Sequence, residues 1–227
     1  MKSSVITFPG SNCDRDIDVA LKKFGFKNKM VWHQDTELPK SDLVVLPGGF
    51  SYGDYLRCGS MASKSKIMKS VINFANSGGM VMGICNGFQI LVETGLVPGV
   101  LLRNKYLEFI CKNVFVKIKN KKNTYFKNID NDVLEFHIAH NEGNYFCTKD
   151  QLKDIEDNEQ IAINYCNKEG LVENQFNPNG SIKNIAGIFN KNKNVLGMMP
   201  HPERMIDRSL SGEDGSLFFN NLINNIK

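Results

Sequence analysis

The segment Gly83-Ile84-Cys85-Asn86-Gly87 has the residue types of a nucleophile elbow. In such an elbow the nucleophile lies on a sharp turn between a buried strand and a helix, and small residues on both sides let the chain turn. An apolar run, 80–84, precedes Cys85, and a helix-like run, 87–94, follows it. The pattern predicts a cysteine nucleophile at a helix N-terminus, where N–H groups and the helix dipole favour the thiolate. The alternative is a small core cysteine with glycines that only pack.

A second segment, Met199-Pro200-His201-Pro202-Glu203, offers a base for that nucleophile. A proline pushes the residue before it toward extended geometry, and in an extended segment residues i and i+2 face the same side. His201 and Glu203 are therefore expected to project together, with Glu203 orienting the imidazole. A surface turn with a chance His and Glu is the alternative. Taken together, the two segments predict a triad of Cys85, His201 and Glu203.

A glycine-rich loop, 47–54, follows the apolar run Asp42–Leu46. Acyl transfer requires backbone N–H groups that point at a developing oxyanion. Gly49 and Asn86 are the candidate donors, because one lies in this loop and the other follows Cys85. The alternative is a tight connection whose glycines adopt positive φ.

Other polar and reactive residues are weaker candidates. His140 ends a strand-like run and begins a polar turn, so a binding role is plausible, and Phe50 and Gln89 are further candidates for positions next to the substrate. Cys13 lies near another strand-to-helix turn but lacks the flanking glycines, and Cys58 is interpreted as structural or substrate-adjacent. The remaining cysteines fall in strand-like runs and are expected to be packed: Cys111, Cys147 and Cys166. No histidine has metal-ligand spacing, so no metal site is predicted.

The composition is that of an ordinary globular protein, with 227 residues, 41% hydrophobic residues, 23% charged residues and a net charge of +4. The basic run Lys117–Lys122 carries no aromatic residues and favours a solvated hairpin over a phosphate-binding patch, so no nucleic-acid partner is expected. The start of the chain lacks a signal-peptide core, and no apolar stretch is long enough for a membrane. The six cysteines contain no CxxC pair. Reduced thiols and a cytoplasmic location are therefore expected.

The first half alternates strand-like and helix-like runs, which predicts a parallel sheet with flanking helices. The expected strands are Ser4–Phe8, Met30–Trp32, Asp42–Leu46 and Met80–Ile84. The expected helices are Asp14–Phe24, Lys66–Ala75 and Gly87–Thr94.

The second half is richer in strands, which predicts hairpins appended to the parallel sheet. The expected strands are Val114–Ile118, Leu134–Ala139, Tyr145–Cys147, Ile161–Tyr165, Ala186–Phe189 and Val195–Met199. An amphipathic helix is expected over Gly215–Ile226. No repeat or low-complexity linker is visible, so residues 1–227 are expected to form a single domain.

The elbow GICNGFQIL and the segment MPHPER resemble the triad-type glutamine amidotransferase family. Longer segments resemble one group within it, the glutaminase subunits of phosphoribosylformylglycinamidine synthases. These segments are FPGSNCDRD, PGGFSYGDYLRCG, RNKYLEFIC, AHNEGNYFC and GMMPHPER. Asn141 departs from the pattern, since the group usually has Gly between His140 and Glu142.

The resemblance implies a flavodoxin-like, mostly parallel α/β sheet with a small antiparallel extension in the second half. It also implies that the cysteine forms a γ-glutamyl thioester from glutamine, that the histidine is general acid and base, and that the glutamate orients it. Ammonia would pass to a large synthetase subunit, with a small bridging subunit, that converts formylglycinamide ribonucleotide to the formylglycinamidine in purine biosynthesis.

No cofactor is expected in this chain; ATP and magnesium are expected on the synthetase. In agreement, Pro47-Gly48-Gly49 lacks the Walker lysine pattern. Three alternatives stay open. The first is a glutaminase that serves another synthetase. The second is a stand-alone PfpI-like cysteine hydrolase, although Asn86 stands where those enzymes usually have His. The third is a non-catalytic scaffold subunit.

Overall fold

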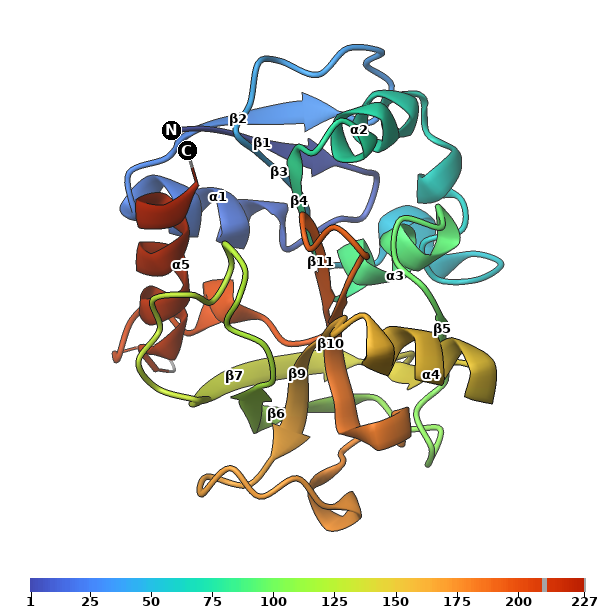
Figure 1. The fold of residues 1–227 in the computed structure, drawn as a ribbon. Coiled ribbons are helices and arrows are strands. Elements are labelled where there is room, and N and C mark those ends of the chain that lie inside the picture. The colour runs from blue at the N-terminus through green and yellow to red at the C-terminus, as the bar shows by residue number, and fades with distance from the viewer. Residues whose placement is uncertain (210–211, 227) are drawn as a thin grey trace.

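A computed structural model describes residues 1–209 and 212–226 (Figure 1). Within these residues, nine strands form one mixed sheet in the order β2-β1-β3-β4-β11-β10-β9-β6-β7. The strands of this sheet are β1 (Lys2–Thr7), β2 (Lys27–Trp32), β3 (Leu43–Leu46), β4 (Met80–Ile84), β6 (Ile110–Ile118), β7 (Val133–His140), β9 (Ile161–Cys166), β10 (Ile185–Phe189) and β11 (Val195–Met198). A separate antiparallel pair is formed by β5 (Val100–Leu102) and β8 (Asn144–Phe146).

The parallel part of the sheet comprises β2, β1, β3, β4 and β11. Its order matches the flavodoxin-like arrangement, in which the second strand lies at the edge and the first lies beside the third. Both β3 and β11 are buried along their whole length. Strands with helices on both faces need such continuous apolar runs. The expectation of a flavodoxin-like α/β fold is therefore confirmed.

Helices cover both faces of the parallel part. They are α1 (Asp14–Lys23), α2 (Lys66–Asn76), α3 (Asn86–Glu93) and α5 (Asp214–Asn225). Figure 1 shows α1 and α5 on one face and α2 and α3 on the other. Phe24 at the end of α1 stacks on Phe219 of α5 with ring centroids 5.6 Å apart. None of the helices in the described part of the chain combines the length and apolar character needed to cross a membrane.

The antiparallel extension continues the same sheet through β10, β9, β6 and β7. Two elements outside this sheet are absent from the expectations drawn from the sequence. They are the strand β5 and a helix, α4 (Lys149–Asp157). The helix was missed because it buries only Ile155 and has almost no apolar stripe. Its signal was a capping box, in which Thr148 accepts the backbone N–H of Gln151 and the Gln151 side chain accepts the N–H of Thr148.

The junction between β4 and α3 leaves no room for side chains at its glycines. A methyl group on Gly87 would overlap the carbonyl oxygen of Leu46, at the end of β3. A methyl group on Gly83 would lie 2.6 Å from the carbonyl oxygen of Gly87. The close approach of α3 to β3 and β4 therefore depends on both glycines, as the elbow pattern predicts.

We expect Gly87→Ala to destabilise the protein by about 3 kcal/mol, the upper end of the usual cost of overpacking, because the methyl group meets backbone atoms that cannot rotate away. The measurement is the free energy of unfolding from denaturant titration. Gly95→Ala is the matched control, since Gly95 has φ 72° and open space around its Cα. Its cost should be only the strain of a left-handed residue, about 1 kcal/mol. Equal losses in the two variants would contradict a steric role for Gly87.

Candidate active site

Cys85 lies on a strained turn between β4 and α3. Its φ of 50° and ψ of −105° are unusual for a residue with a side chain. The turn is held by a hydrogen bond of 2.8 Å from the Cys85 N–H to the carbonyl of Met198. The thiol lies 3.5 Å from the carbonyl oxygen of Ala139 on β7. Cys85 is thus placed at the helix N-terminus that the elbow pattern predicts, where three strands meet.

The side chains of His201 and Glu203 meet directly, as expected. Nδ1 of His201 lies 2.6 Å from Oε1 of Glu203, and both side chains are almost inaccessible to solvent. The reason differs from the one that the sequence suggested. Glu203 lies in a short 3₁₀ helix, η5 (Pro202–Arg204), so a turn rather than strand alternation brings it to the imidazole. The backbone N–H of His201 is fixed by a 2.8 Å hydrogen bond to the carbonyl of His137 on β7.

The imidazole of His201 is set up to carry a proton. Burial opposes the imidazolium, but the charges of Glu203 and Cys85 outweigh it and raise the pKa of His201 to about 10. Because Nδ1 is bound to Glu203, Nε2 is the atom left to exchange a proton. Nε2 is buried, and the thiol of Cys85 is the hydrogen-bonding group that acts on the ring besides Glu203. The arrangement can hold an imidazolium beside a thiolate.

The two oxyanion-hole candidates lie around the same turn. Gly49 has φ 130°, and a methyl group there would come within 2.6 Å of the Asn12 nitrogen, so only glycine fits. Asn86 begins α3, where backbone N–H groups lack intrahelical acceptors. The neighbouring Gly48 was not singled out from the sequence, yet a methyl group on it would lie 2.7 Å from Cε1 of His201. The loop thus reaches the catalytic candidates, and the donor roles of Gly49 and Asn86 stay predictions.

The side chain of Gln89 is already used within the protein. Its Nε2 donates to the carbonyl of Glu142 at 2.7 Å, and its Oε1 accepts from Asn86 at 2.8 Å. Phe50 is 44% exposed and stacks on Phe109 with ring centroids 6.3 Å apart. Gln89 therefore ties α3 to the 141–143 turn, whereas Phe50 has a free face. Neither position tests the expectation that these residues adjoin the substrate.

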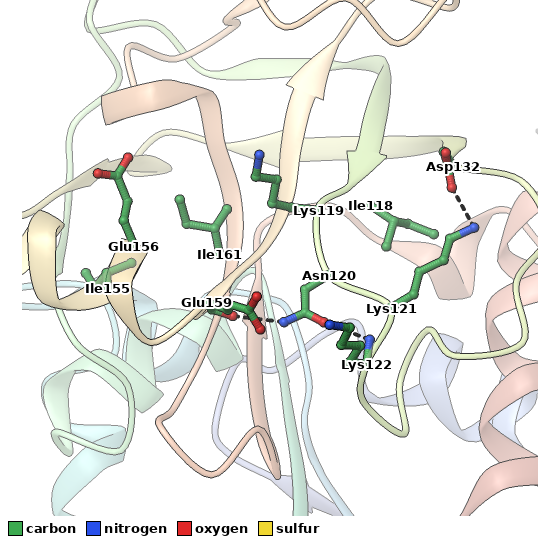
Figure 2. A pocket seen from close by; sticks show the side chains of 10 residues that line it. All are labelled: Ile118, Lys119, Asn120, Lys121, Lys122, Asp132, Ile155, Glu156, Glu159 and Ile161. Atoms are coloured by element: carbon green, nitrogen blue, oxygen red, sulfur yellow. Dashed lines mark hydrogen bonds and ion pairs between the residues drawn. The ribbon is translucent and has the colours of Figure 1, made fainter.

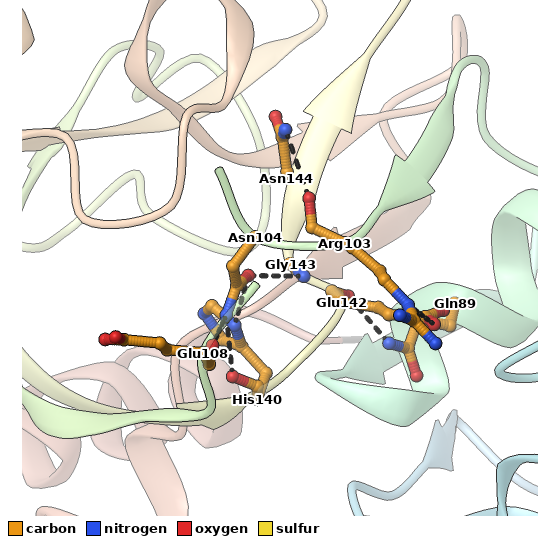
Figure 3. A network of polar contacts seen from close by, with 8 residues as sticks. All are labelled: Gln89, Arg103, Asn104, Glu108, His140, Glu142, Gly143 and Asn144. Atoms are coloured by element: carbon orange, nitrogen blue, oxygen red, sulfur yellow. Dashed lines mark hydrogen bonds and ion pairs between the residues drawn. The ribbon is translucent and has the colours of Figure 1, made fainter. Parts of the chain in front are cut away.

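His140 is buried at the end of β7 and is held by a residue that the sequence analysis missed. Asn104 lies 36 positions earlier in the chain, and its Oδ1 is 3.1 Å from Nδ1 of His140 (Figure 3). Burial, together with the charge of His201, lowers the pKa of His140 to about 4. The only sequence signal for Asn104 was its place inside RNKYLEFIC. No local rule connects that segment to His140.

The cysteines other than Cys85 fall into two groups. Burial raises the pKa of Cys13 to about 12 despite the nearby Arg204, and burial also raises the pKa of Cys58, with Asp54 adding to the effect. Cys111 is exposed, so the expectation that it is packed was wrong. It lies in the first part of β6, which pairs with β7 alone and whose residues 111–113 are exposed. Cys147 and Cys166 are buried as expected.

A cavity of about 590 Å³ lies between the end of β6, the start of β9 and α4, away from Cys85 (Figure 2). It includes part of the basic run, residues 119–122, and one of the lysines there already has a charged partner. Lys121 forms an ion pair of 2.5 Å with Asp132, and Lys117 donates to the carbonyl of Gly170. These contacts fit the solvated-hairpin interpretation of that run. No group of metal-ligating side chains occurs in residues 1–209 and 212–226.

Residues 1–212 match the family described as CobB/CobQ-like glutamine amidotransferase domain. Phosphoribosylformylglycinamidine synthase subunit PurQ of Pelagibacter ubique (strain HTCC1062) is 79% identical over 227 residues, with 100% of both chains covered. The subunit of that name from Synechocystis sp. is 52% identical over 217 residues, which cover 95% of this chain and 97% of its own. The chain belongs to the PurQ family of glutamine amidotransferases.

A solved structure, that of PurLQS from Thermotoga maritima, supports the placement in the PurQ family. It is 38% identical, superposes with a TM-score of 0.88, and the match covers 100% of this chain and 99% of that one. The resemblance seen in the sequence segments is thereby confirmed. PurQ membership also removes the support for a stand-alone PfpI-like hydrolase.

We expect Glu203→Gln to lower the pKa of His201 by about one to three units, because the buried imidazolium loses its neighbouring negative charge. Histidine titration by NMR measures this, and four histidines make the spectrum tractable. Asp207→Asn is the control, since it removes the same charge from an exposed position four residues further on. An unchanged His201 titration in Glu203→Gln would show that the carboxylate does not stabilise the imidazolium.

Proposed function

We propose that this chain hydrolyses glutamine through a thioester on Cys85 and delivers the ammonia to the synthetase that makes formylglycinamidine ribonucleotide. The observation that carries the proposal is the buried His201–Glu203 pair beside Cys85, in a chain of the PurQ family. A non-catalytic scaffold would have no use for a buried, ordered pair whose free nitrogen lies next to a strained cysteine.

In the proposed mechanism the Cys85 thiolate attacks the side-chain amide carbon of glutamine. The carbonyl oxygen becomes an oxyanion, which accepts hydrogen bonds from the N–H groups of Gly49 and Asn86. The carbon–nitrogen bond then breaks, and His201 gives its Nε2 proton to the leaving nitrogen to form ammonia. A γ-glutamyl thioester on Cys85 remains.

Water completes the cycle. Neutral His201 removes a proton from a water molecule, whose oxygen attacks the thioester carbon. The carbon–sulfur bond breaks, glutamate leaves, and Cys85 and His201 return to their starting states. Glu203 holds Nδ1, so the same ring nitrogen, Nε2, exchanges the proton in both half-reactions. Loss of one oxyanion donor should cost about 10²–10³ in rate, whereas loss of the thiol removes the covalent route.

The partners form part of the same proposal. A large synthetase subunit would supply the ATP and magnesium sites, a small subunit would bridge the two, and this chain would need no cofactor for the steps above. A nucleophilic thiolate works in a reducing compartment, so we place the reaction in the cytoplasm. The name PurLQS of the similar solved structure is in keeping with a complex of several subunits.

The first test labels the protein with 6-diazo-5-oxo-norleucine, a reactive glutamine mimic, and maps the adduct by peptide mass spectrometry. We expect a single adduct on Cys85 that excess glutamine prevents. Cys111 is an internal reference, because an exposed thiol should react with iodoacetamide but not selectively with the mimic. Labelling of Cys13 or Cys58 instead would overturn the triad. No labelling, with the synthetase present, would favour a scaffold.

The second test separates ammonia production from ammonia use. With Cys85→Ser, glutamine-dependent synthesis by the complex should fall by a factor of at least about 10³, while synthesis from added ammonium chloride should stay near the wild-type rate. Cys147→Ser is the control for loss of a buried thiol outside the site. Near-normal glutamine-dependent turnover in Cys85→Ser would refute the thioester route.

A further inference from the structure

The side chain of Asn104 makes four hydrogen bonds that join two loops beside the site (Figure 3). Its Nδ2 donates to the carbonyl oxygens of Glu108 at 2.8 Å and His140 at 2.9 Å. Its Oδ1 accepts the N–H of Gly143 at 3.1 Å and lies 3.1 Å from Nδ1 of His140. An amide side chain has two donors and two acceptor lone pairs, so every position is filled. Asn104 is only 1% exposed.

These contacts determine where the proton of His140 lies. Two carbonyl oxygens face one end of the Asn104 amide, so that end must be the NH₂ group. The other end is therefore the oxygen, which can only accept. Nδ1 of His140 must then carry a hydrogen and donate it to Asn104. A neutral ring protonated on Nδ1 leaves a lone pair on Nε2.

Nε2 of His140 is buried and has no donor within the described part of the chain. Gly143 packs against the ring, since a methyl group on it would touch the imidazole atoms. Ala139, the residue before His140, presents its carbonyl oxygen to the thiol of Cys85 at 3.5 Å. The orientation of His140 and the shape of the 139–143 segment are therefore set by the same amide that fixes the tautomer.

The charges around His140 favour the neutral ring. Burial has the largest effect in lowering the pKa of His140, and the imidazolium of His201 lowers it further by repulsion. A hydrogen bond with the backbone of His140 itself raises the pKa and is the smallest of the three effects. The carboxylate of Glu142 is paired with Arg103 at 3.8 Å, and Figure 3 shows both directed away from His140. Glu108 is exposed, and its carboxylate also points away from the ring. No described carboxylate therefore balances a charge on His140.

We propose that Asn104 is a positioning residue that fixes the proton of His140 on Nδ1 and, as an uncharged acceptor, leaves burial to keep the ring neutral, so that His201 is the only histidine cation beside Cys85. A second imidazolium would repel the first and compete for the negative charge of the thiolate. Burial opposes that second charge, and the neutral oxygen of Asn104 does not offset the effect of burial, whereas a carboxylate in its place would attract a proton to His140. The effect on turnover rests on the proposed glutaminase function; the tautomer does not.

The test uses long-range ¹H–¹⁵N NMR of the histidine rings, with His140 assigned from its missing signal in His140→Gln. In the wild-type protein His140 should show the neutral Nδ1–H pattern from about pH 5.5 to 8. In Asn104→Asp it should titrate above pH 6.5, because the carboxylate stabilises the imidazolium. With the synthetase present, kcat/KM for glutamine should then fall at least about tenfold more at pH 6 than at pH 8.

Asn144→Asp is the matched control. Asn144 lies next to Gly143 and donates to the carbonyl of Arg103, but it does not touch His140. It should leave the His140 pattern and the pH profile unchanged. An Nε2–H tautomer in the wild-type protein would overturn the proposal even if Asn104→Asp does not fold. So would an equal loss of activity at every pH in Asn104→Asp. Failure of the labelling test on Cys85 would refute the glutaminase function but leave the tautomer result standing.

Discussion

The rest of the site depends on one backbone conformation, that of Cys85. A residue with a side chain at φ 50° stores about 1–3 kcal/mol of strain and persists only where its surroundings impose it. Here β4 enters the turn paired with β3 and β11, and α3 leaves it pressed against β3. Gly83 and Gly87 allow that approach. The thiol is therefore presented by the sheet, and small motions of a loop cannot move it.

The buried pair of His201 and Glu203 has an energetic cost of another kind, the removal of two charges from water. Removing two charges from water costs several kcal/mol for each ion, so such a pair needs close contact and further fixed partners. The 2.6 Å contact supplies the first. The 2.8 Å bond from the His201 N–H to the carbonyl of His137 fixes only the backbone, and Oε2 of Glu203 has no hydrogen-bond partner among the described residues. The prolines on both sides of His201 limit the unfolded conformations that must be ordered. A pair of this kind contributes orientation and charge to the site more than it contributes to stability.

The parts of this site that are local in sequence could be predicted, and those that join distant segments could not. The strand, turn and helix around Cys85 follow from one apolar run and two glycines. The proximity of His201 to Glu203 follows from their separation of two positions in the chain. Asn104 could not be found this way, because its partner lies 36 positions away and an asparagine in a loop has many uses. The exposure of Cys111 was missed for a related reason. A strand-like pattern does not reveal which end of the strand extends beyond the core.

Comparison of the thiols explains why a helix N-terminus alone does not select the nucleophile. Cys13 also precedes a helix, and Arg204 donates to its sulfur at 3.0 Å, so it too has a cationic neighbour. Burial nevertheless keeps its pKa near 12, well above neutral pH. More importantly, a guanidinium stays protonated at any physiological pH and cannot pass a proton to a leaving group. Hydrolysis of an amide needs a partner that both stabilises the thiolate and releases its proton. Among the described residues, the pairing of a thiol with a buried, oriented imidazole occurs at Cys85 and His201.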